Sequence, residues 1–320
     1  MGSPVRTRVT AATLAVVAAF LWATYYLFVL AASPAARPSA GLFYPFAGGA
    51  VAYAVWAAAR RRLEVVARVF RDPRAYARLG FLLGMQVSVL AATYLIGPVD
   101  ASLLSLLGDV VATPLVVALL FAEHRPELRA PALVLGLLLS LAGGTLAIVG
   151  GHGLASVRDL GWAVVVAVPV CVALFFVLSA RAGAAVPISA VIAQSMIAAA
   201  IASIAFSPLI PGGLVGVARI GARPLALLAV NGVVSFCIAP ICYFRSIELA
   251  GLVLPPMLMT GIPVFTLLLS ASVLGLAPAT LALLGVPVAA AGGIIALSAG
   301  ARANPPSPRG PPRDGATGNR

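Results

Sequence analysis

Ten apolar stretches, each about 20 residues long, follow one another along almost the whole chain. Because a helix rises 1.5 Å per residue, each stretch is long enough to cross the roughly 30 Å hydrocarbon layer of a membrane. Charged residues make up only 9% of the sequence and the mean hydropathy is +1.08, whereas soluble domains carry about 25% charged residues. The sequence therefore predicts an all-α integral membrane protein with ten transmembrane helices.

The apolar stretches also give the expected helix boundaries. The ten helices are predicted over residues 9–31, 41–59, 79–97, 101–121, 131–150, 160–180, 188–210, 224–244, 250–272 and 278–300. The tail, residues 301–320, is rich in Pro, Gly and Arg and has no apolar face to bury. We therefore expect the tail to be disordered.

The basic residues are distributed unevenly between the loops. All 21 of them are arginines. With the N-terminus in the cytoplasm, 17 arginines fall in cytoplasmic segments and four on the opposite side. The positive-inside rule therefore predicts that both termini face the cytoplasm. This topology accounts for the formal net charge of +12, and no pattern of aromatic and basic residues favours a nucleic-acid partner.

The chain contains an internal repeat. Residues 22–26 align with residues 172–176 at an offset of 150. At an offset of 153, the segment "TYLIGPVDASLLSLLGDVV" aligns with "SIELAGLVLPPMLMTGIPV". At an offset of 149, Gly136 aligns with Gly285, and one "AGG" aligns with another. Three matches in the same order at nearly one offset favour a duplication.

The duplication predicts two five-helix repeats, residues 1–155 and 156–300. Because five is an odd number, the second repeat enters the membrane from the opposite side, which makes the repeat inverted. In an inverted repeat the two halves can exchange conformations and open a central site to either face. The architecture therefore favours secondary transport by alternating access.

These features resemble the drug/metabolite transporter superfamily, and specifically its EamA-type permeases. The resemblance rests on ten helices in two sets of five, on Trp22 in the first helix, on "ATY" ending at Tyr94 and on "LLFAE" ending at Glu123. Members of this family carry two acids fourteen residues apart in this region, as Asp109 and Glu123 are here. The resemblance implies a permease for metabolites or drugs.

The chain departs from the family pattern at three positions. Val110 stands in place of a proline, Ala122 in place of a glycine, and Leu276 in place of the acid of the second repeat. The proline is kept in the second repeat as Pro263. Because the acid is present in the first repeat and absent from the second, the two repeats are expected to have specialised.

Asp109 is the one acid deep within a predicted helix. It lies eight residues into the span 101–121, roughly 12 Å from the end of that span. An ionisable group at such depth usually faces a cavity or the interior of the helix bundle. One interpretation is a residue that couples transport to protons or binds a cationic substrate. The other is a protonated structural residue bonded to Ser105 or Thr113, one turn away.

Several other side chains within the predicted spans are candidates for lining a substrate cavity. The alternative for the polar ones is hydrogen bonding between helices, and for the aromatic ones of the first span it is anchoring at the membrane interface. These candidates are Trp22, Tyr25, Tyr26, Gln86, Tyr94, Gln194 and Asn231. Arg245 and Glu248, three residues apart, are expected to form a local ion pair and are a candidate cytoplasmic gate.

The sequence predicts a permease of the inner (cytoplasmic) membrane that moves a small organic metabolite or drug, with proton-coupled export as the preferred form. An uncoupled facilitator or exchanger is the first alternative. A non-transporting scaffold and an intramembrane enzyme acting on lipid are the others, and the enzyme is disfavoured because the spans hold no deep histidine beside Asp109. Membrane lipid, the substrate and protons are the expected partners. Cysteines and histidines lack the spacing of metal ligands, so no metal or cofactor is expected.

Overall fold

The computed structural model describes residues 4–61, 70–71, 74–112, 130–156, 166–175, 188–250 and 254–303, together with residues 64, 67, 115, 116 and 119. Within these residues all regular structure is helical. Five helical segments are long and apolar enough to cross a membrane. The predicted all-α class is confirmed, and the apolar helices are compatible with a place in a membrane. Glu123 and the tail beyond residue 303 lie outside the described residues.

The helices of the first half are α1 (Pro4–Ala32), α2 (Pro38–Ala59), α4 (Arg74–Leu95), α5 (Pro98–Leu107) with its π-helical continuation η1 (Gly108–Ala112), and α7 (Pro131–Ser156). Those of the second half are α9 (Ile188–Phe206), η3 (Ser207–Leu209), α10 (Gly213–Ala218), α11 (Ala222–Asn231), the π-helical η4 (Gly232–Ile238), α12 (Ala239–Ala250), α13 (Leu254–Met259), α14 (Ile262–Leu274) and α15 (Thr280–Ala303). Proline lies in the first turn of α2, α5 and α14, where its missing N–H costs no helical hydrogen bond.

The predicted span 250–272 is wrong as a single helix. The chain breaks between α13 and α14 at Thr260 and Gly261. Pro263 follows at the start of α14, where it lacks the N–H that would bond to the carbonyl four residues earlier and so continue α13. By contrast, the predicted span 224–244 lies within a longer run, in which α11, η4 and α12 follow one another without a break.

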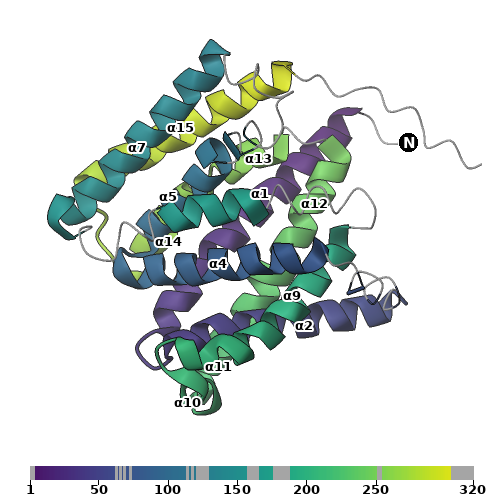
Figure 1. Cartoon of the computed structure of the whole chain (residues 1–320). Helices are drawn as coiled ribbons and strands as arrows, with labels where there is room; N and C mark the ends of the chain where they lie inside the picture. The colour runs from purple at the N-terminus through teal and green to yellow at the C-terminus, as the bar shows by residue number, and fades with distance from the viewer. Residues whose placement is uncertain are drawn as a thin grey trace, which may run out of the picture.

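Helix α1 lies among helices of the second half and packs against α11, α12, α13 and α14 (Figure 1). Over residues 11–23, its buried face is made of small residues at helical spacing, and each is 0% exposed: Ala11, Ala15, Ala18, Ala19 and Ala23. Small side chains let helix backbones approach closely in a membrane protein. At one end of this face, the Ser246 hydroxyl of α12 donates to the carbonyl oxygen of Ala11 at 2.7 Å.

Helices α7 and α15 lie side by side along one edge of the molecule (Figure 1). Glycines bring their backbones together: a Cβ atom at Gly143 would lie 2.4 Å from the backbone nitrogen of Ala289, and one at Gly136 would lie 2.4 Å from that of Ala296. As the residue number rises along α7, the contacting number falls along α15, so the two helices are antiparallel.

Large apolar side chains remain exposed on the outer helices. Val55 of α2 is 65% exposed, and Leu138 of α7 and Leu284 of α15 are each 59% exposed. Soluble proteins rarely leave large contiguous apolar surfaces uncovered. This outer surface is therefore suited to contact with lipid.

Candidate functional site

Asp109 lies in η1, the π-helical turn that continues α5, and is half-buried. Its neighbour Gly108 lets residues 166–175 approach, because a Cβ atom at Gly108 would lie 2.7 Å from the Cβ of Val172. π-helical turns disturb the regular pattern of backbone hydrogen bonds and are frequent at functional sites. The carboxylate is thus carried by an irregular turn inside the helix bundle.

Two tyrosines are close enough to Asp109 to interact electrostatically with its carboxylate: Tyr26 of α1 and Tyr243 of α12. The Tyr26 hydroxyl lies 3.0 Å from the Ser105 hydroxyl, which in turn lies 3.2 Å from the carbonyl oxygen of Ala101. In the described part of the chain, no hydrogen bond joins Ser105 to Asp109. The other expected partner, Thr113, lies outside the described residues.

An aromatic cluster, here the rings of Trp22, Tyr25, Tyr26, Phe46, Phe236 and Tyr243, includes the two tyrosines near Asp109. The ring centroids of Trp22 and Tyr243 are 5.3 Å apart, as are those of Tyr25 and Tyr26. Phe236 lies 5.7 Å from Tyr25 and 5.3 Å from Phe46. Tyr25 and Tyr26 are 7% and 5% exposed, so they pack inside the bundle and do not anchor α1 at its outer surface.

Polar contacts hold α1 against η4 beside this cluster. The Trp22 indole nitrogen donates to the carbonyl oxygen of Ser235 at 2.9 Å. The Ser235 hydroxyl lies 3.1 Å from the carbonyl oxygen of Leu21 and 2.8 Å from Oδ1 of Asn231, and its single proton serves one of them at a time. Nδ2 of the fully buried Asn231 has no hydrogen-bond partner.

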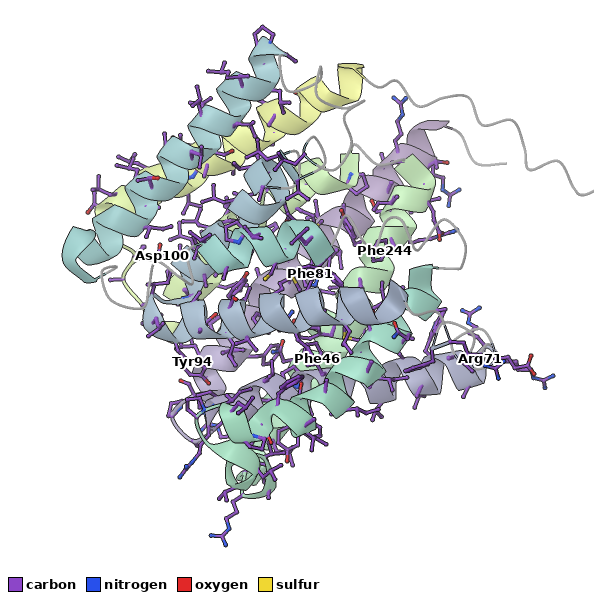
Figure 2. The ribbon with its side chains drawn as sticks, viewed as in Figure 1. Phe46, Arg71, Phe81, Tyr94, Asp100 and Phe244 are labelled. Atoms are coloured by element: carbon purple, nitrogen blue, oxygen red, sulfur yellow. The ribbon has the colours of Figure 1, made fainter. Side chains whose placement is uncertain are left out.

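The remaining sequence candidates lie on α4 and α9. Tyr94 is near the end of α4 (Figure 2) and lies in the neighbourhood of Tyr25. Gln86 is 9% exposed and Gln194 is 0% exposed. Neither atom of the Gln194 amide has a hydrogen-bond partner. Among the residues that the structure describes, no hydrogen bond joins Gln86 or Gln194 to the aromatic cluster.

Arg245 and Glu248 form the expected ion pair, with Nη1 of Arg245 2.7 Å from Oε2 of Glu248. Both residues lie on α12, and their side chains are 60% and 55% exposed. An exposed pair within one helix contributes at most about 1 kcal/mol. The pair is present, and its role as a gate stays a prediction.

Sequence reasoning missed three members of the cluster, Phe46, Phe236 and Tyr243. Tyr243 lies at the end of the predicted span 224–244, where aromatic residues usually mark the membrane interface. Tyr243 follows the polar residue Ser235 of the same span by eight residues. This spacing could have linked the two, because residues about two turns apart lie on one face of a helix. The backbone partner of Trp22 had no such signal, since every residue carries a carbonyl oxygen.

The arrangement can hold a positive charge. A carboxylate with two nearby phenol groups can bind a proton or a cation, and aromatic faces attract cations within about 6 Å. Five of the sequence candidates lie near Asp109 and the aromatic cluster, directly or through a shared neighbour: Trp22, Tyr25, Tyr26, Tyr94 and Asn231. The structure therefore joins Asp109 to one group of the predicted residues.

Comparison with known proteins shows the fold. No family model matches the sequence, and no curated protein matches it. Six chains of solved structures match. One of them, described only as "Crystal structure of protein", superposes with a TM-score of 0.68 at 22% sequence identity, over 90% of this chain and 97% of that chain. The architecture thus occurs in a solved structure, and at this identity the likeness concerns the fold alone.

Proposed function

We propose that the chain is a secondary transporter of the EamA type, which moves a small organic metabolite or drug across the inner membrane by alternating access. Its ten helices form two inverted five-helix repeats, both termini are cytoplasmic, and proton-coupled export is the preferred form. The observation that carries the proposal is the proximity of Asp109 both to Tyr26 of the first half and to Tyr243 of the second. A movement of one half against the other would change the surroundings of this carboxylate.

Reciprocal contacts between α7 and α15 support the inverted repeat. Gly136 approaches Gly292 and Ala296, while Gly285, its counterpart 149 residues later, approaches Gly143 and Ala147. The same offset relates Gly143 to Gly292 and Ala147 to Ala296. Each helix therefore offers the other the equivalent residues, as in a contact between two copies related by a two-fold axis.

A second pair of contacts supports the same relation. A Cβ atom at Gly144 would meet the Leu107 side chain at 3.4 Å, and one at Gly293 would meet the Thr260 side chain at 2.6 Å. Gly293 follows Gly144 by 149 residues, and Thr260 follows Leu107 by 153 residues. These are two of the offsets at which the sequence repeats.

The placement of charge supports the proposed topology. Figure 2 shows Arg71 and Phe244 toward one end of the bundle, and Tyr94 and Asp100 toward the other. Arg71 belongs to the arginine-rich segment between α2 and α4. With that end in the cytoplasm, the loop from α4 to α5 faces outward.

The proposed function is tested by comparing the solutes of medium and cytoplasm among cells that lack the protein, overproduce it, or carry Asp109→Asn at matched expression. We expect at least one small organic compound to be exported by the wild type and retained by the variant. Asp109→Glu, which keeps the carboxylate, is the matched control and should retain part of the export.

Two results would change this account. Export that Asp109→Asn leaves unchanged would remove the coupling role and favour the uncoupled facilitator. If no solute in the medium or the cytoplasm changes among the strains, the transport proposal fails and the scaffold is favoured.

A further inference from the structure

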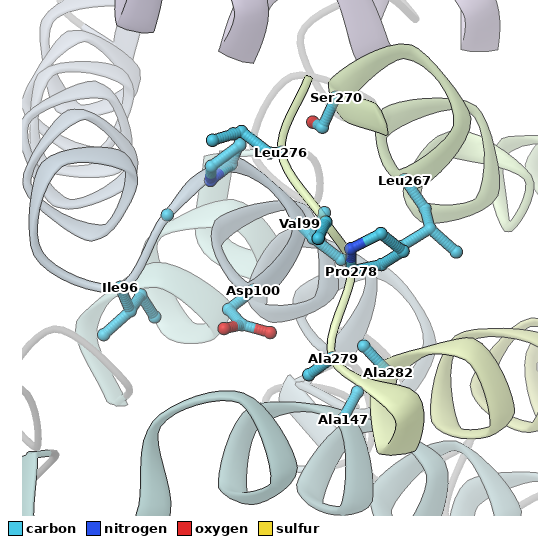
Figure 3. A pocket seen from close by; sticks show the side chains of 13 residues that line it. Ile96, Val99, Asp100, Ala147, Leu267, Ser270, Leu276, Pro278, Ala279 and Ala282 are labelled. Atoms are coloured by element: carbon cyan, nitrogen blue, oxygen red, sulfur yellow. The ribbon is translucent and has the colours of Figure 1, made fainter. Parts of the chain in front are cut away.

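A cavity of about 180 Å³ lies at the end of the bundle where α4 ends and α5 begins (Figure 3). The loop from α14 to α15 forms another part of its wall, and Ala147 of α7 and Ala282 of α15 contribute as well. An engineered apolar cavity of about 150 Å³ binds benzene. This pocket therefore has room for a compact molecule of roughly that size.

Two polar side chains line a pocket that is otherwise mostly apolar. Asp100, in the first turn of α5, is 6% exposed, and Ser270 of α14 is 2% exposed. The Ser270 hydroxyl has no hydrogen-bond partner, although a buried hydroxyl normally has one. Side chains such as Ile96, Leu267 and Leu276 supply apolar lining.

This pocket is distinct from the site around Asp109. Asp100 and Asp109 are nine residues apart, which turns their side chains to opposite sides of a helix at 100° per residue. Asp100 faces the walls formed by α7, α14 and α15, whereas Asp109 interacts with tyrosines of α1 and α12.

We propose that this pocket binds a small organic amine, that is, an ammonium group on a compact apolar body. The Asp100 carboxylate, which has several acceptor sites, can accept N–H bonds from an ammonium group. The Ser270 hydroxyl can accept one N–H bond, and the apolar walls cover the body of the ligand. The inference concerns binding alone and does not rest on the proposed transport cycle.

The walls of the pocket come from both halves of the chain. Residues 96–100 and Ala147 belong to the first half, and residues 267–282 belong to the second. A ligand bound between them contacts both halves at this end. Binding should therefore stabilise the arrangement in which the α4–α5 turn and the α14–α15 loop lie together.

The test uses the purified full-length chain in a non-ionic detergent, titrated with cyclopentylamine and with cyclopentanol. These probes share a ring and differ in the group that Asp100 would bind. We expect cyclopentylamine to raise the unfolding temperature in a saturable manner and to give a binding isotherm, and cyclopentanol to do neither. Equal effects of the two probes, or no binding of either, would overturn the proposal.

Variants locate the bound amine. We expect Asp100→Asn to weaken cyclopentylamine binding at least tenfold, and Ala279→Leu, which places carbon in the pocket, to abolish it. Loss of one hydrogen bond in Ser270→Ala should weaken binding about two- to tenfold. Ser272→Ala is the matched control, because Ser272 is exposed and bonds to its own helix. If Asp100→Asn fails to fold, the Ala279→Leu variant still tests the proposal. Unchanged cyclopentylamine binding by Ala279→Leu would contradict it.

A lipid headgroup with a primary ammonium presents the same chemistry as a free amine. Repeating the titration in nanodiscs of phosphatidylglycerol, with and without phosphatidylethanolamine, separates the two sources. Competition by phosphatidylethanolamine assigns the site to a headgroup, and undiminished binding assigns it to a free amine. Either result supports an ammonium site, provided that Ala279→Leu removes it.

Discussion

The indole nitrogen of Trp22 donates a hydrogen bond to the backbone carbonyl of Ser235 at 2.9 Å. This bond joins α1 to η4, whose π-helical turns depart from the usual backbone pairing. Beside it, the Trp22 ring packs on Tyr243, which is near Asp109. The position of α1 is therefore held at one place by a polar contact with η4 and a ring contact with α12.

Replacing Trp22 with Phe should destabilise the protein. The change keeps an aromatic ring but removes the N–H donor, and a lost hydrogen bond typically costs about 0.5–1.5 kcal/mol. Thermal unfolding in detergent would measure the loss as a lower unfolding temperature. Trp56→Phe is the control, because Trp56 is half-buried on α2 and makes a ring contact with Tyr53. Equal shifts in both variants would contradict a special role of the Trp22 bond.

Replacing Gly143 with Ala should also destabilise the protein, by about 1–3 kcal/mol. The added Cβ would lie 2.4 Å from the Ala289 backbone nitrogen and 2.6 Å from the Gly285 carbonyl oxygen, so α7 and α15 would have to separate. Gly285→Ala should have a similar effect, because its Cβ would lie 2.5 Å from the Gly143 carbonyl oxygen.

Gly80→Ala provides the control for both glycine variants. Gly80 is an exposed residue of α4, and a Cβ atom there would meet nothing within 4 Å. Alanine in a helix interior is favoured over glycine by about 0.5–1 kcal/mol, so this variant should be neutral or slightly stabilised. The unfolding temperatures of the three variants test whether the close packing of α7 on α15 causes the loss of stability. Similar losses in all three would show that tight packing of α7 on α15 is not the cause.

The hydrogen bond between Tyr26 and Ser105 can be measured by a double-mutant cycle. Their hydroxyl oxygens are 3.0 Å apart, so Tyr26→Phe and Ser105→Ala remove the same bond. We expect a coupling free energy of about 0.5–1.5 kcal/mol between the two substitutions in chemical or thermal unfolding. Strictly additive losses would show that the bond contributes nothing to stability.

How far the sequence predicts this structure depends on the kind of feature. The predicted span 41–59 corresponds to α2, and the predicted span 131–150 lies within α7, because length and hydropathy suffice for long apolar helices. The break between α13 and α14 was not predicted, because apolar residues continue across it. Asp100 was overlooked because it lies in the short connection expected between two spans, and its burial depends on helices distant in sequence.

The predicted local ion pair of Arg245 and Glu248 is present, yet its contribution should be small. Glu248→Gln should change the free energy of unfolding by less than about 0.5 kcal/mol, because both side chains are more than half exposed. Unfolding temperatures at low and high salt would measure the change. A larger loss that disappears at high salt would indicate that the pair has a further charged partner, as a gate requires.

The central claim, alternating access around Asp109, is tested most directly by labelling a cysteine beside it. The three native cysteines are first replaced with Ala: Cys171, Cys237 and Cys242. A single new cysteine, Ser105→Cys, is then introduced one turn before Asp109. A small membrane-impermeant thiol reagent is applied to right-side-out and to inverted membrane vesicles. Arg71→Cys, in the arginine-rich segment, and Val55→Cys, on the apolar outer surface, are the controls. We expect Ser105→Cys to react from both faces, Arg71→Cys from one face, and Val55→Cys from neither. Reaction of Ser105→Cys from one face alone, or from neither, would contradict alternating access at this site.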